Sequence, residues 1–557
     1  MHVRDIRFFS IRFLNRRALF ALMMVAAAIS ALAQQTGGPV VVAPVTDVAP
    51  VADAAPVADA APLVDAARLY QSHCASCHGA DRFGLMGPAL MPESLERLRR
   101  PQALEVLRSG RVATQMPGFA GKLTDAEIAA LAEYIYSAPA QSPQWTEQAI
   151  TASRVIDPAA LKLPAKPVFE ADPHNLFIVV EAGDHHVSIL DGDKLEPIHR
   201  FASRYALHGG PKFSADGRFV YFASRDGWIS KYDIWNLRVV AEIRAGINTR
   251  NLAVSSDGKW VMVANYLPRT LVLLDAEDLA FKRVYDVQDA RGKASRVSAV
   301  YDAAPRRSFI AALKDSPQIW EISYDPNAEP VYRGYVHDYK LGEGVAEPGQ
   351  FTPRTIDLGK PLDDFYFDPA YNRVMGASRE GQAEVIDLRA RRKVADLDLG
   401  GMPHLGSGIS FDYNGHPVMA TTNLTAAKVT VIDMQDWKKV ADIPINGAGF
   451  FLRSHDATPY MWVDAMMDPK YRDTLQVIDK RTLKVVGSVT PSAGKTSMHV
   501  EFTRDGRYAL VSLSEKDGAI VVYDAATLKE VKRLPMVKPI GKYNVWNKTT
   551  RERGTSH

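Results

Sequence analysis

The feature that most constrains this chain is a short β-hairpin unit that recurs through residues 165–557. In each copy an apolar strand, a turn and a second apolar strand follow one another, and the turn of the clearest copies contains Asp-Gly. The clearest copies are residues 213–220, 254–261 and 502–509. Asp-Gly between two alternating apolar runs is a strong hairpin signal. A further strand ending in aspartate follows, as at Asp233 and Asp524. The sequence therefore predicts a β-rich repeat architecture.

The number and spacing of these units predict a propeller. Seven of them begin near Leu207, Arg250, Val297, Asp364, Gly408, Phe450 and His499. An eighth begins at Asn175 and lacks its own first strand, which residues 541–546 can supply. Units of about 40–45 residues have the period of a β-propeller, and closing the ring in this way leaves no exposed edge. We expect an all-β eight-bladed propeller over residues 165–557, with seven blades as the alternative.

Histidines, arginines and aspartates stand at the starts of these units. They are His208, Arg250, Arg296, Asp363, Asp364, His404, Arg453, His455 and His499. The innermost strands of a propeller begin at one rim of its central channel, so we expect these side chains to converge there. Arginine matches carboxylates with a charged fork, and histidine can ligate iron or transfer a proton. The set predicts a site for a haem-like molecule with several carboxylates, and unrelated rim positions are the alternative.

The first 62 residues predict an export signal and a linker. In residues 1–33 an arginine-rich start precedes the apolar run Ala18–Leu32 and the small-x-small pattern that ends at Ala33. The run is shorter than the roughly twenty residues that span a bilayer, which favours cleavage over an uncleaved anchor. Residues 34–62 are rich in alanine and proline and predict a semi-extended linker. We expect a periplasmic protein without a transmembrane span; the sequence leaves the export route open.

The two cysteines of the chain, Cys74 and Cys77, stand directly before His78 in a Cys-x-x-Cys-His motif. This is the attachment motif of c-type haem: each thiol bonds a vinyl group and the imidazole ligates the iron. A redox dithiol is the alternative, whereas a zinc site would need further ligands and the chain has no other cysteine. Helices are predicted over 63–73 and over 124–136, where Thr124 is the N-cap and Glu127 completes a capping box. The sequence thus predicts an all-α c-type cytochrome domain at 63–140 with one covalent haem.

The surroundings of this motif resemble class I c-type cytochromes over residues 63–138. The resemblance rests on Gly87-Pro88 after the motif and on Met116-Pro117-Gly118-Phe119 further along. It implies that Met116 is the sixth iron ligand and that the domain carries electrons. Core filling is the alternative role for Met116, and His73, next to the motif, is a rival ligand.

A cytochrome c domain followed by this propeller resembles the cytochrome cd1 nitrite reductase superfamily over residues 63–557. The resemblance implies that the propeller binds haem d1, with His208 as its iron ligand. It also places three side chains against the d1 ring and its carboxylates and one at a distal position: Arg225, Arg250, Tyr266 and His404. Where these reductases have their second distal histidine, this chain has Asp363. An ionised aspartate would repel nitrite, which puts nitrite reduction in doubt.

The Asp363-Asp364-Phe365 replacement and the motif at 181–186 make the chain similar to dihydro-haem d1 dehydrogenases, a paralogous family. The resemblance implies that a propionate of dihydro-haem d1 loses two hydrogens and becomes the acrylate of haem d1. Electrons would pass to the c haem and then to an external acceptor such as a small cytochrome. The expected carboxylate-holding residues are Arg225, Arg250 and Arg296, and the catalytic candidates are His499, His404, Glu501 and His455. Either His499 or His404 would take the proton.

Three other functions remain open at this point. One is an NO-forming nitrite reductase, and another is a non-catalytic carrier that delivers haem d1 to that reductase. The third is an interaction module fused to a cytochrome. The 67 Lys and Arg residues nearly balance 64 Asp and Glu residues, so a nucleic-acid partner is not expected.

Overall fold

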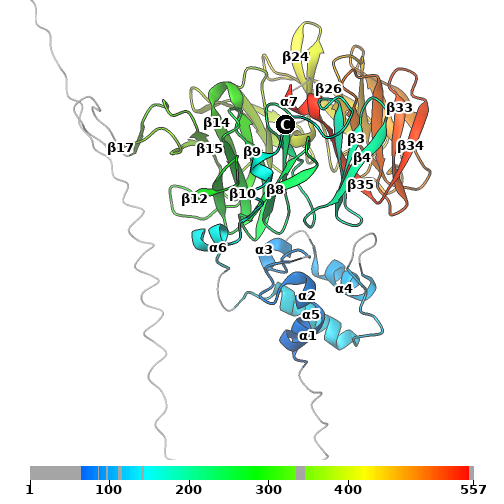
Figure 1. Cartoon of the computed structure of the whole chain (residues 1–557). Helices are drawn as coiled ribbons and strands as arrows, with labels where there is room; N and C mark the ends of the chain where they lie inside the picture. Colours follow the sequence, from blue (N-terminus) through cyan, green and yellow to red (C-terminus); the bar gives the residue numbers. More distant parts are fainter. Residues whose placement is uncertain are drawn as a thin grey trace, which may run out of the picture. The chain divides into compact units, whose positions relative to one another are not determined.

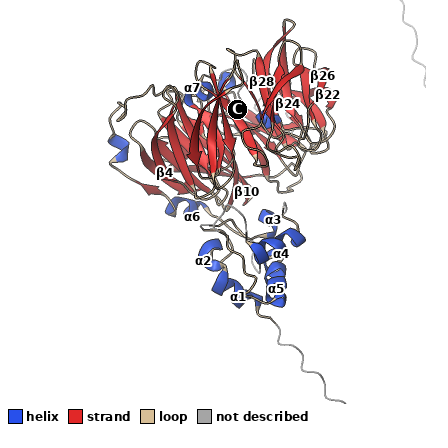
Figure 2. Ribbon diagram, turned by 90° about the vertical axis from the view of Figure 1, so that its right-hand side faces the viewer, coloured by secondary structure: helices blue, strands red, loops and turns tan. Residues whose placement is uncertain are grey.

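The structure, a computed structural model, describes residues 64–85, 87–95, 98–110, 116–139, 143–333 and 345–550. The predicted signal at 1–33 and the predicted linker at 34–62 lie outside the described residues. Those described belong to one compact unit. Most of its α-helices lie before residue 153 and its strands lie after it, so a helical portion precedes a β portion, as predicted. Figure 2 shows these two portions, with short helical segments among the strands.

The helical portion is a small all-α domain. Its helices are α1 (Ala66–His73), α2 (Ala75–His78), α3 (Pro92–Leu95), α4 (Arg100–Ser109) and α5 (Asp125–Tyr136). The capping box predicted for α5 is present: the Thr124 backbone N–H donates to the Glu127 carboxylate and the Glu127 N–H donates to the Thr124 hydroxyl. The helices enclose an apolar cluster that includes Tyr70, Leu107 and Phe119. Two short elements, α6 (Glu147–Ala152) and the 3-10 turn Ala160–Lys162, then lead towards the strands.

The β portion is the predicted eight-bladed propeller (Figure 1). Eight antiparallel sheets of four or five strands form the blades within the described residues, and each runs from an inner strand to an outer one. In that order, the first four blades are β35 (Pro539–Asn544), β2 (Leu176–Glu181), β3 (His186–Asp191), β4 (Glu196–Ala202); β5 (Lys212–Phe213), β6 (Phe219–Ala223), β7 (Trp228–Asp233), β8 (Arg238–Arg244), with β1 (Val155–Ile156) added outside; β9 (Asn248–Val254), β10 (Trp260–Leu267), β11 (Thr270–Asp275), β12 (Phe281–Asp286); and β13 (Val297–Ala303), β14 (Ser308–Leu313), β15 (Gln318–Ser323), β18 (Pro353–Asp357).

The other four blades continue the ring. They are β19 (Asp364–Phe367), β20 (Arg373–Ala377), β21 (Gln382–Asp387), β22 (Arg392–Asp398); β23 (Ile409–Tyr413), β24 (His416–Thr422), β25 (Lys428–Asp433), β26 (Lys439–Pro444); β27 (Leu452–Ser454), β28 (Tyr460–Asp464), β29 (Leu475–Asp479), β30 (Lys484–Val489); and β31 (Ser497–Phe502), β32 (Tyr508–Leu513), β33 (Gly518–Asp524), β34 (Glu530–Met536). A separate hairpin, β16 (Val331–Arg333) with β17 (Val345–Glu347), stands outside the blades.

The ring closes as the sequence predicts, because the last strand, β35, pairs with β2 of the first blade. Ile178 lies opposite Tyr543, and Val179 lies opposite Lys542. The prediction ran two residues too far, since Trp546 belongs to a short helix, α7 (Val545–Thr549), whose N-cap is Asn544. Closure satisfies the inner edge of β2, which would otherwise expose unpaired backbone groups.

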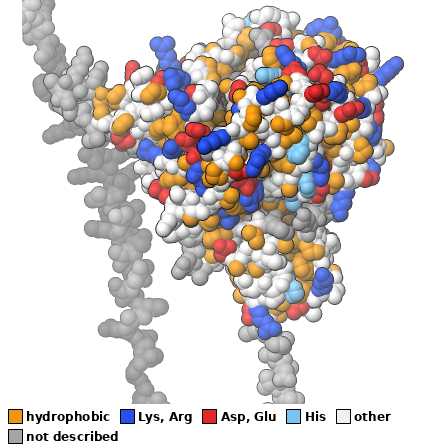
Figure 3. Space-filling model, viewed as in Figure 1, with side chains coloured by type: hydrophobic (Ala, Val, Ile, Leu, Met, Phe, Trp, Pro, Cys, Tyr) orange, Lys and Arg blue, Asp and Glu red, His pale blue; other side chains and the backbone are white. Residues whose placement is uncertain are grey.

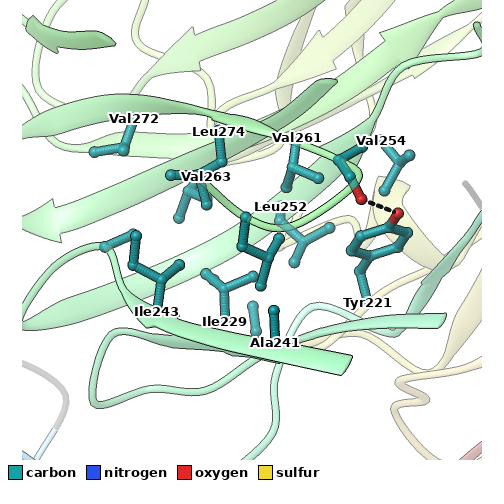
Figure 4. Packing of buried hydrophobic residues seen from close by; sticks show 14 of the residues in the cluster. Tyr221, Ile229, Ala241, Ile243, Leu252, Val254, Val261, Val263, Val272 and Leu274 are labelled. Carbon is teal, nitrogen blue, oxygen red and sulfur yellow. Dashed lines mark hydrogen bonds between the residues drawn. The ribbon is translucent and has the colours of Figure 1, made fainter. Parts of the chain in front are cut away.

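The blades hold together through apolar faces that pack against one another. Between the second and third blades, side chains such as Ile229, Leu252 and Val263 interlock, and the Tyr221 hydroxyl donates to the Ala276 carbonyl at 2.8 Å (Figure 4). Middle strands such as β14 are buried along their whole length, whereas the outer strand β22 alternates exposed and half-buried residues. The burial pattern follows from position: a middle strand has a neighbouring blade on both faces, and an outer strand borders solvent.

Two further properties concern the surface. Positive and negative side chains are interspersed over the visible face of the molecule, with no stripe of one sign (Figure 3). None of the described helices is long and apolar enough to cross a membrane.

Candidate functional site

The haem-attachment residues lie on the short helix α2 and the residue before it. Cys74 and His78 are buried and Cys77 is half-buried. The His78 Nδ1 lies 2.8 Å from the Pro88 carbonyl, which fixes the proton on Nδ1 and leaves Nε2 for a metal. Burial lowers the pKa of His78, so the ring is in its neutral, ligating form. A Cβ at Gly87 would lie 2.6 Å from the His78 ring, so only glycine allows this approach. These residues fit a covalent c haem.

The two candidates for the sixth iron ligand, Met116 and His73, differ in their exposure to solvent. Met116 packs against the apolar cluster of the helical domain, while His73 is exposed on α1, edge-on to Phe119 with ring centroids 6.1 Å apart. Both border the same cavity as Cys74 and His78. The partly buried setting of Met116 is better suited to a fixed axial ligand than the exposed position of His73.

One cavity of about 790 Å³ joins residues of both predicted cofactor sites. Its lining includes eight of the predicted site residues: Cys74, Cys77, His78, Met116, His208, Arg225, Tyr266 and Arg296. The other five lie outside this lining: Arg250, His404, His455, His499 and Glu501. The haem-attachment motif and the predicted iron ligand of the propeller thus line the same cavity.

His208 presents one nitrogen to this cavity. Its Nδ1 lies 2.8 Å from the Arg250 carbonyl and therefore carries the proton, so Nε2 has the lone pair. Arg225 donates to that Nε2 at 2.7 Å, and an Arg250 guanidinium nitrogen lies 3.2 Å from it. An iron bound at Nε2 would take the place of these donors and release the Arg225 guanidinium towards a carboxylate.

The predicted carboxylate-holding arginines differ in their surroundings. Arg250 stands behind His208, where its Nε donates to the Ser298 carbonyl at 2.9 Å. Arg296 forms a forked ion pair with Asp315, with nitrogen–oxygen distances of 2.5 and 2.9 Å. Tyr266 lies beside Arg296, whose guanidinium carbon is 5.6 Å from the ring centroid. Arg225 is therefore the arginine best placed to bind a ligand carboxylate. The Arg296 guanidinium would have to bind a ligand carboxylate and Asp315 at the same time.

Asp363, which the resemblance to nitrite reductases places at a distal position, is held by two cations. Lys314 forms a close ion pair with it, and the Arg379 Nε lies 3.1 Å away. Burial by itself would raise the pKa of Asp363, but Lys314 and Arg379 outweigh that effect and hold the pKa well below its usual range. Asp363 is thus an ionised, paired carboxylate and cannot donate a proton at neutral pH.

His404 precedes the 3-10 turn Leu405–Ser407 at the start of the sixth blade. Its Nδ1 lies 2.7 Å from the Phe450 carbonyl, and its ring packs on the Phe450 ring with centroids 4.1 Å apart. Burial, together with the nearby Arg250 and Arg453, lowers the pKa of His404 to about 4. The imidazole is therefore neutral at physiological pH.

His499, on the inner strand β31, is fully buried between two aromatic rings. The centroid of Phe451 is 4.6 Å from the imidazole, and that of Tyr543 is 5.2 Å away. Among the described residues neither ring nitrogen has a hydrogen-bond partner, although both are buried. Burial, with Lys542 and Arg453 nearby, lowers the pKa of His499 well below its usual value. A buried imidazole without a hydrogen-bond partner is energetically unfavourable unless a bound ligand supplies that hydrogen bond.

The last two predicted catalytic residues occupy supporting positions. Glu501 accepts from the Asn547 side chain at 2.9 Å and from the Phe502 backbone at 3.0 Å. The Nδ1 of His455 accepts from the Ala457 backbone at 3.1 Å, and its ring fills the space above Gly506. Burial lowers the pKa of His455 as well. Their other polar atoms, Glu501 Oε2 and His455 Nε2, are buried without a hydrogen-bond partner among the described residues.

Several residues around the site were missed by sequence reasoning. Phe451, Lys542 and Tyr543 border His499, and Lys314 with Arg379 pairs with Asp363. Lysine and tyrosine in the terminal strand could have been noticed, because β35 closes the ring and its residues necessarily face the channel or a neighbouring blade. The pairing of Asp363 has no local signal.

Comparisons with known proteins agree with this geometry. Residues 171–337 and 345–548 match the family described as cytochrome D1 heme domain, and residues 61–135 match cytochrome C oxidase, cbb3-type, subunit III. A Pseudomonas aeruginosa protein named dihydro-heme d1 dehydrogenase is 55% identical over 490 residues, which are 88% of this chain and 95% of that protein. A nitrite reductase of Stutzerimonas stutzeri is 26% identical over 531 residues, 86% of this chain and 92% of its own length.

A solved structure described as dihydro-heme d1 dehydrogenase NirN in complex with DHE resembles the present one with a TM-score of 0.78. The two are 55% identical, and the match covers 86% of this chain and 99% of that one. The d1 family match spans more than half of the present chain and coincides with its eight blades. The chain therefore belongs to the cytochrome D1 heme domain family, in a two-domain form with an N-terminal cytochrome c domain.

Proposed function

We propose that this protein is a dihydro-haem d1 dehydrogenase, an oxidoreductase of haem d1 biosynthesis. The observation that carries the proposal is its 55% identity, over 88% of its length, to a protein of that name. The solved structure of such an enzyme in complex with DHE, which has the same architecture, supports a tetrapyrrole substrate for this chain as well.

Dihydro-haem d1 would bind in the propeller with its iron at the Nε2 of His208. The proton on the Nδ1 of His208, held by the Arg250 carbonyl, supports this orientation. Arg225 would turn from His208 to a carboxylate of the substrate, and Tyr266 and Arg296 would border it. A guanidinium meets a carboxylate with two parallel hydrogen bonds, which fixes the side chain as well as binding it.

The reaction would remove two hydrogens from adjacent carbons of one propionate, leaving the double bond of an acrylate. Two protons and two electrons leave the substrate. His499 would accept a proton, because both its ring nitrogens lack hydrogen-bond partners in the described part of the chain. His404 is the second acceptor position, since the Phe450 carbonyl holds its Nδ1 proton and leaves Nε2 unprotonated.

The electrons would leave through the c haem held by Cys74, Cys77 and His78, with Met116 as the sixth ligand. One covalent haem accepts one electron at a time. Each turnover therefore needs two transfers to an external one-electron acceptor, for which a small cytochrome is suited. Residues 1–33 as an export signal and 34–62 as a linker would place this exchange in the periplasm.

The proposal is tested by incubating the purified, haem-c-loaded protein without oxygen with dihydro-haem d1 and a chemical oxidant. The tetrapyrrole is followed by mass and by its visible spectrum. We expect a loss of two hydrogens that depends on the protein. Tight binding with no change of mass would contradict the proposal and indicate a carrier.

A parallel assay separates the remaining alternative. The protein loaded with haem d1 is given nitrite and an electron donor, and nitric oxide is measured. We expect none, because Asp363 is an ionised carboxylate at the place of a distal histidine. Nitric oxide formation at a rate above that of free haem would support a nitrite reductase instead.

A further inference from the structure

The backbone of His499 departs from the strand that carries it. Its φ is +47°, in the left-handed region that residues other than glycine rarely adopt. The pairing of β31 with β32 shifts here, so that Met498 lies opposite Ser512, Val500 lies opposite Val511, and His499 has no partner residue on β32. This is a β-bulge, and bulges commonly re-aim a side chain. Such a conformation costs on the order of 1–3 kcal/mol and persists only where its surroundings impose it.

Side chains from two other blades take over the hydrogen bonds that the bulge leaves open. The backbone N–H of His499 donates to the Asp464 carboxylate at 3.2 Å, and Asp464 ends β28 of the preceding blade. The Lys542 Nζ donates to the His499 carbonyl, and Lys542 lies on β35 of the following blade. Both backbone groups of this one residue are therefore held by ionisable side chains, each at most 1% exposed.

The same carboxylate also fixes the ring that covers His499. Asp464 accepts from the backbone N–H groups of Phe450 at 2.8 Å and Phe451 at 3.2 Å. The Phe451 ring packs on the imidazole, and the Phe450 carbonyl accepts from His404. One buried aspartate thus sets the backbone of His499 together with the segment that holds His404.

We infer that Lys542 and Asp464 are positioning residues that hold the His499 bulge and so fix where its imidazole lies. The inference rests on the proposed function, in which His499 takes a proton. Without these two side chains, the backbone N–H and C=O of His499 would have to form the regular hydrogen bonds between β31 and β32. Because strand side chains alternate between faces, a one-residue return to regular pairing turns the imidazole to the other face of the blade.

A role in stability alone does not explain these residues. Burying an ammonium is costly, and apolar replacements of buried charges are often neutral or stabilising. Lys542 is fully buried, and its nearest charges are Glu501, Arg453 and Asp464. The Lys542 amine nevertheless lies in this buried setting, where it donates to the His499 carbonyl. The geometry that it imposes on His499 explains why a lysine stands here.

The test compares Lys542→Met with a matched control. Lys231 is also buried and its Nζ donates to a backbone carbonyl, that of Glu277 at 2.8 Å, but it borders no part of the site. We expect Lys542→Met to lower kcat about 10- to 100-fold, as misplacing a catalytic group does, while the dissociation constant of dihydro-haem d1 stays unchanged. Lys231→Met should leave both values unchanged. Full kcat in Lys542→Met, or an equal loss in both variants, would overturn the inference.

A second variant and a crystal structure keep the test decisive if Lys542→Met does not fold. Asp464→Asn preserves the shape but leaves one oxygen for at least three backbone donors, so we expect a smaller loss of kcat, again without loss of binding. Crystal structures of both variants should show residue 499 out of the left-handed region. A retained bulge would contradict the inference. If the wild-type protein itself removes no hydrogens, the proposed function fails, while the backbone at residue 499 in the variants still reports on the positioning.

Discussion

His404 makes the stability of this protein depend on pH in a predictable direction. Burial lowers its pKa to about 4, whereas an unfolded histidine titrates at about 6.5. Between these values the unfolded chain binds more protons, so this contribution to stability is present above pH 6.5 and is lost as the pH falls to 4. The wild-type free energy of unfolding should therefore fall between pH 7 and pH 4.5, and in His404→Gln we expect this fall to be smaller by up to about 3 kcal/mol. Guanidinium unfolding at the two pH values measures it. The same pH slope in variant and wild type would show that His404 titrates normally.

His499 gives the sharpest test of chemistry at the residue scale. Within the described part of the chain its imidazole has no hydrogen-bond partner on either nitrogen, so removing it leaves no described protein group unsatisfied. We expect His499→Ala to lower turnover at least about 100-fold, the usual contribution of a general base, while dihydro-haem d1 still binds through His208 and Arg225. Normal turnover in this variant would exclude His499 as the base and turn attention to His404.

The sixth ligand of the c haem is decided by two variants. Met116 packs against the apolar cluster while His73 is exposed, so we favour Met116 as the ligand. We expect Met116→Ala to abolish the thioether-to-iron charge-transfer band of the oxidised haem and to lower its reduction potential, because a thioether raises it. His73→Ala should change neither. The opposite pattern would assign the ligand to His73.

The hairpins are the elements whose geometry the sequence predicts best, and two of their glycines form a natural comparison. Gly258 and Gly506 have φ values of +71° and +70°, in equivalent Asp-Gly turns. A Cβ at Gly258 would meet no described atom within 4 Å, while one at Gly506 would lie 2.5 Å from the His455 ring. We expect Gly258→Ala to cost about 1–2 kcal/mol from backbone strain alone, and Gly506→Ala to cost about 2–5 kcal/mol because overpacking adds to it. Guanidinium unfolding measures both, and equal costs would show that His455 moves aside freely.

At the scale of the whole molecule, stability depends on one long-range strand pairing. β35 and β2 are separated by most of the propeller in sequence, yet they form the inner half of one blade. A chain that ends at Lys538 would leave the inner edge of β2 unpaired. We expect this truncated protein to lose its cooperative thermal transition and to aggregate. Adding a peptide of residues 539–550 should partly restore the cooperative transition. A sharp transition in the truncated protein would mean that the other seven blades hold the ring closed.

Features fixed by neighbouring residues could be predicted from the sequence, and those that need distant residues could not. The Cys-x-x-Cys-His motif, the capping box at Thr124 and the Asp-Gly turns each span a few residues, so covalent geometry alone brings their groups together. The blade count and ring closure follow from repeated spacing in the same way. His208, Arg225, Tyr266 and Arg296 were placed by family resemblance, and the structure brings them to one cavity with the haem-attachment motif.

The sequence by itself determined the attachment motif, the turns, the eight blades and the order of the two domains, because each depends on spacing along the chain. Only the tertiary structure decided that Asp363 is paired with Lys314 and Arg379, and that Asp464 and Lys542 hold the backbone of His499. Asp464 and Lys542 are 35 and 43 residues from His499, on two other blades. Such groups meet only when the ring has closed, since the contact depends on the position of whole blades and not on any local conformation.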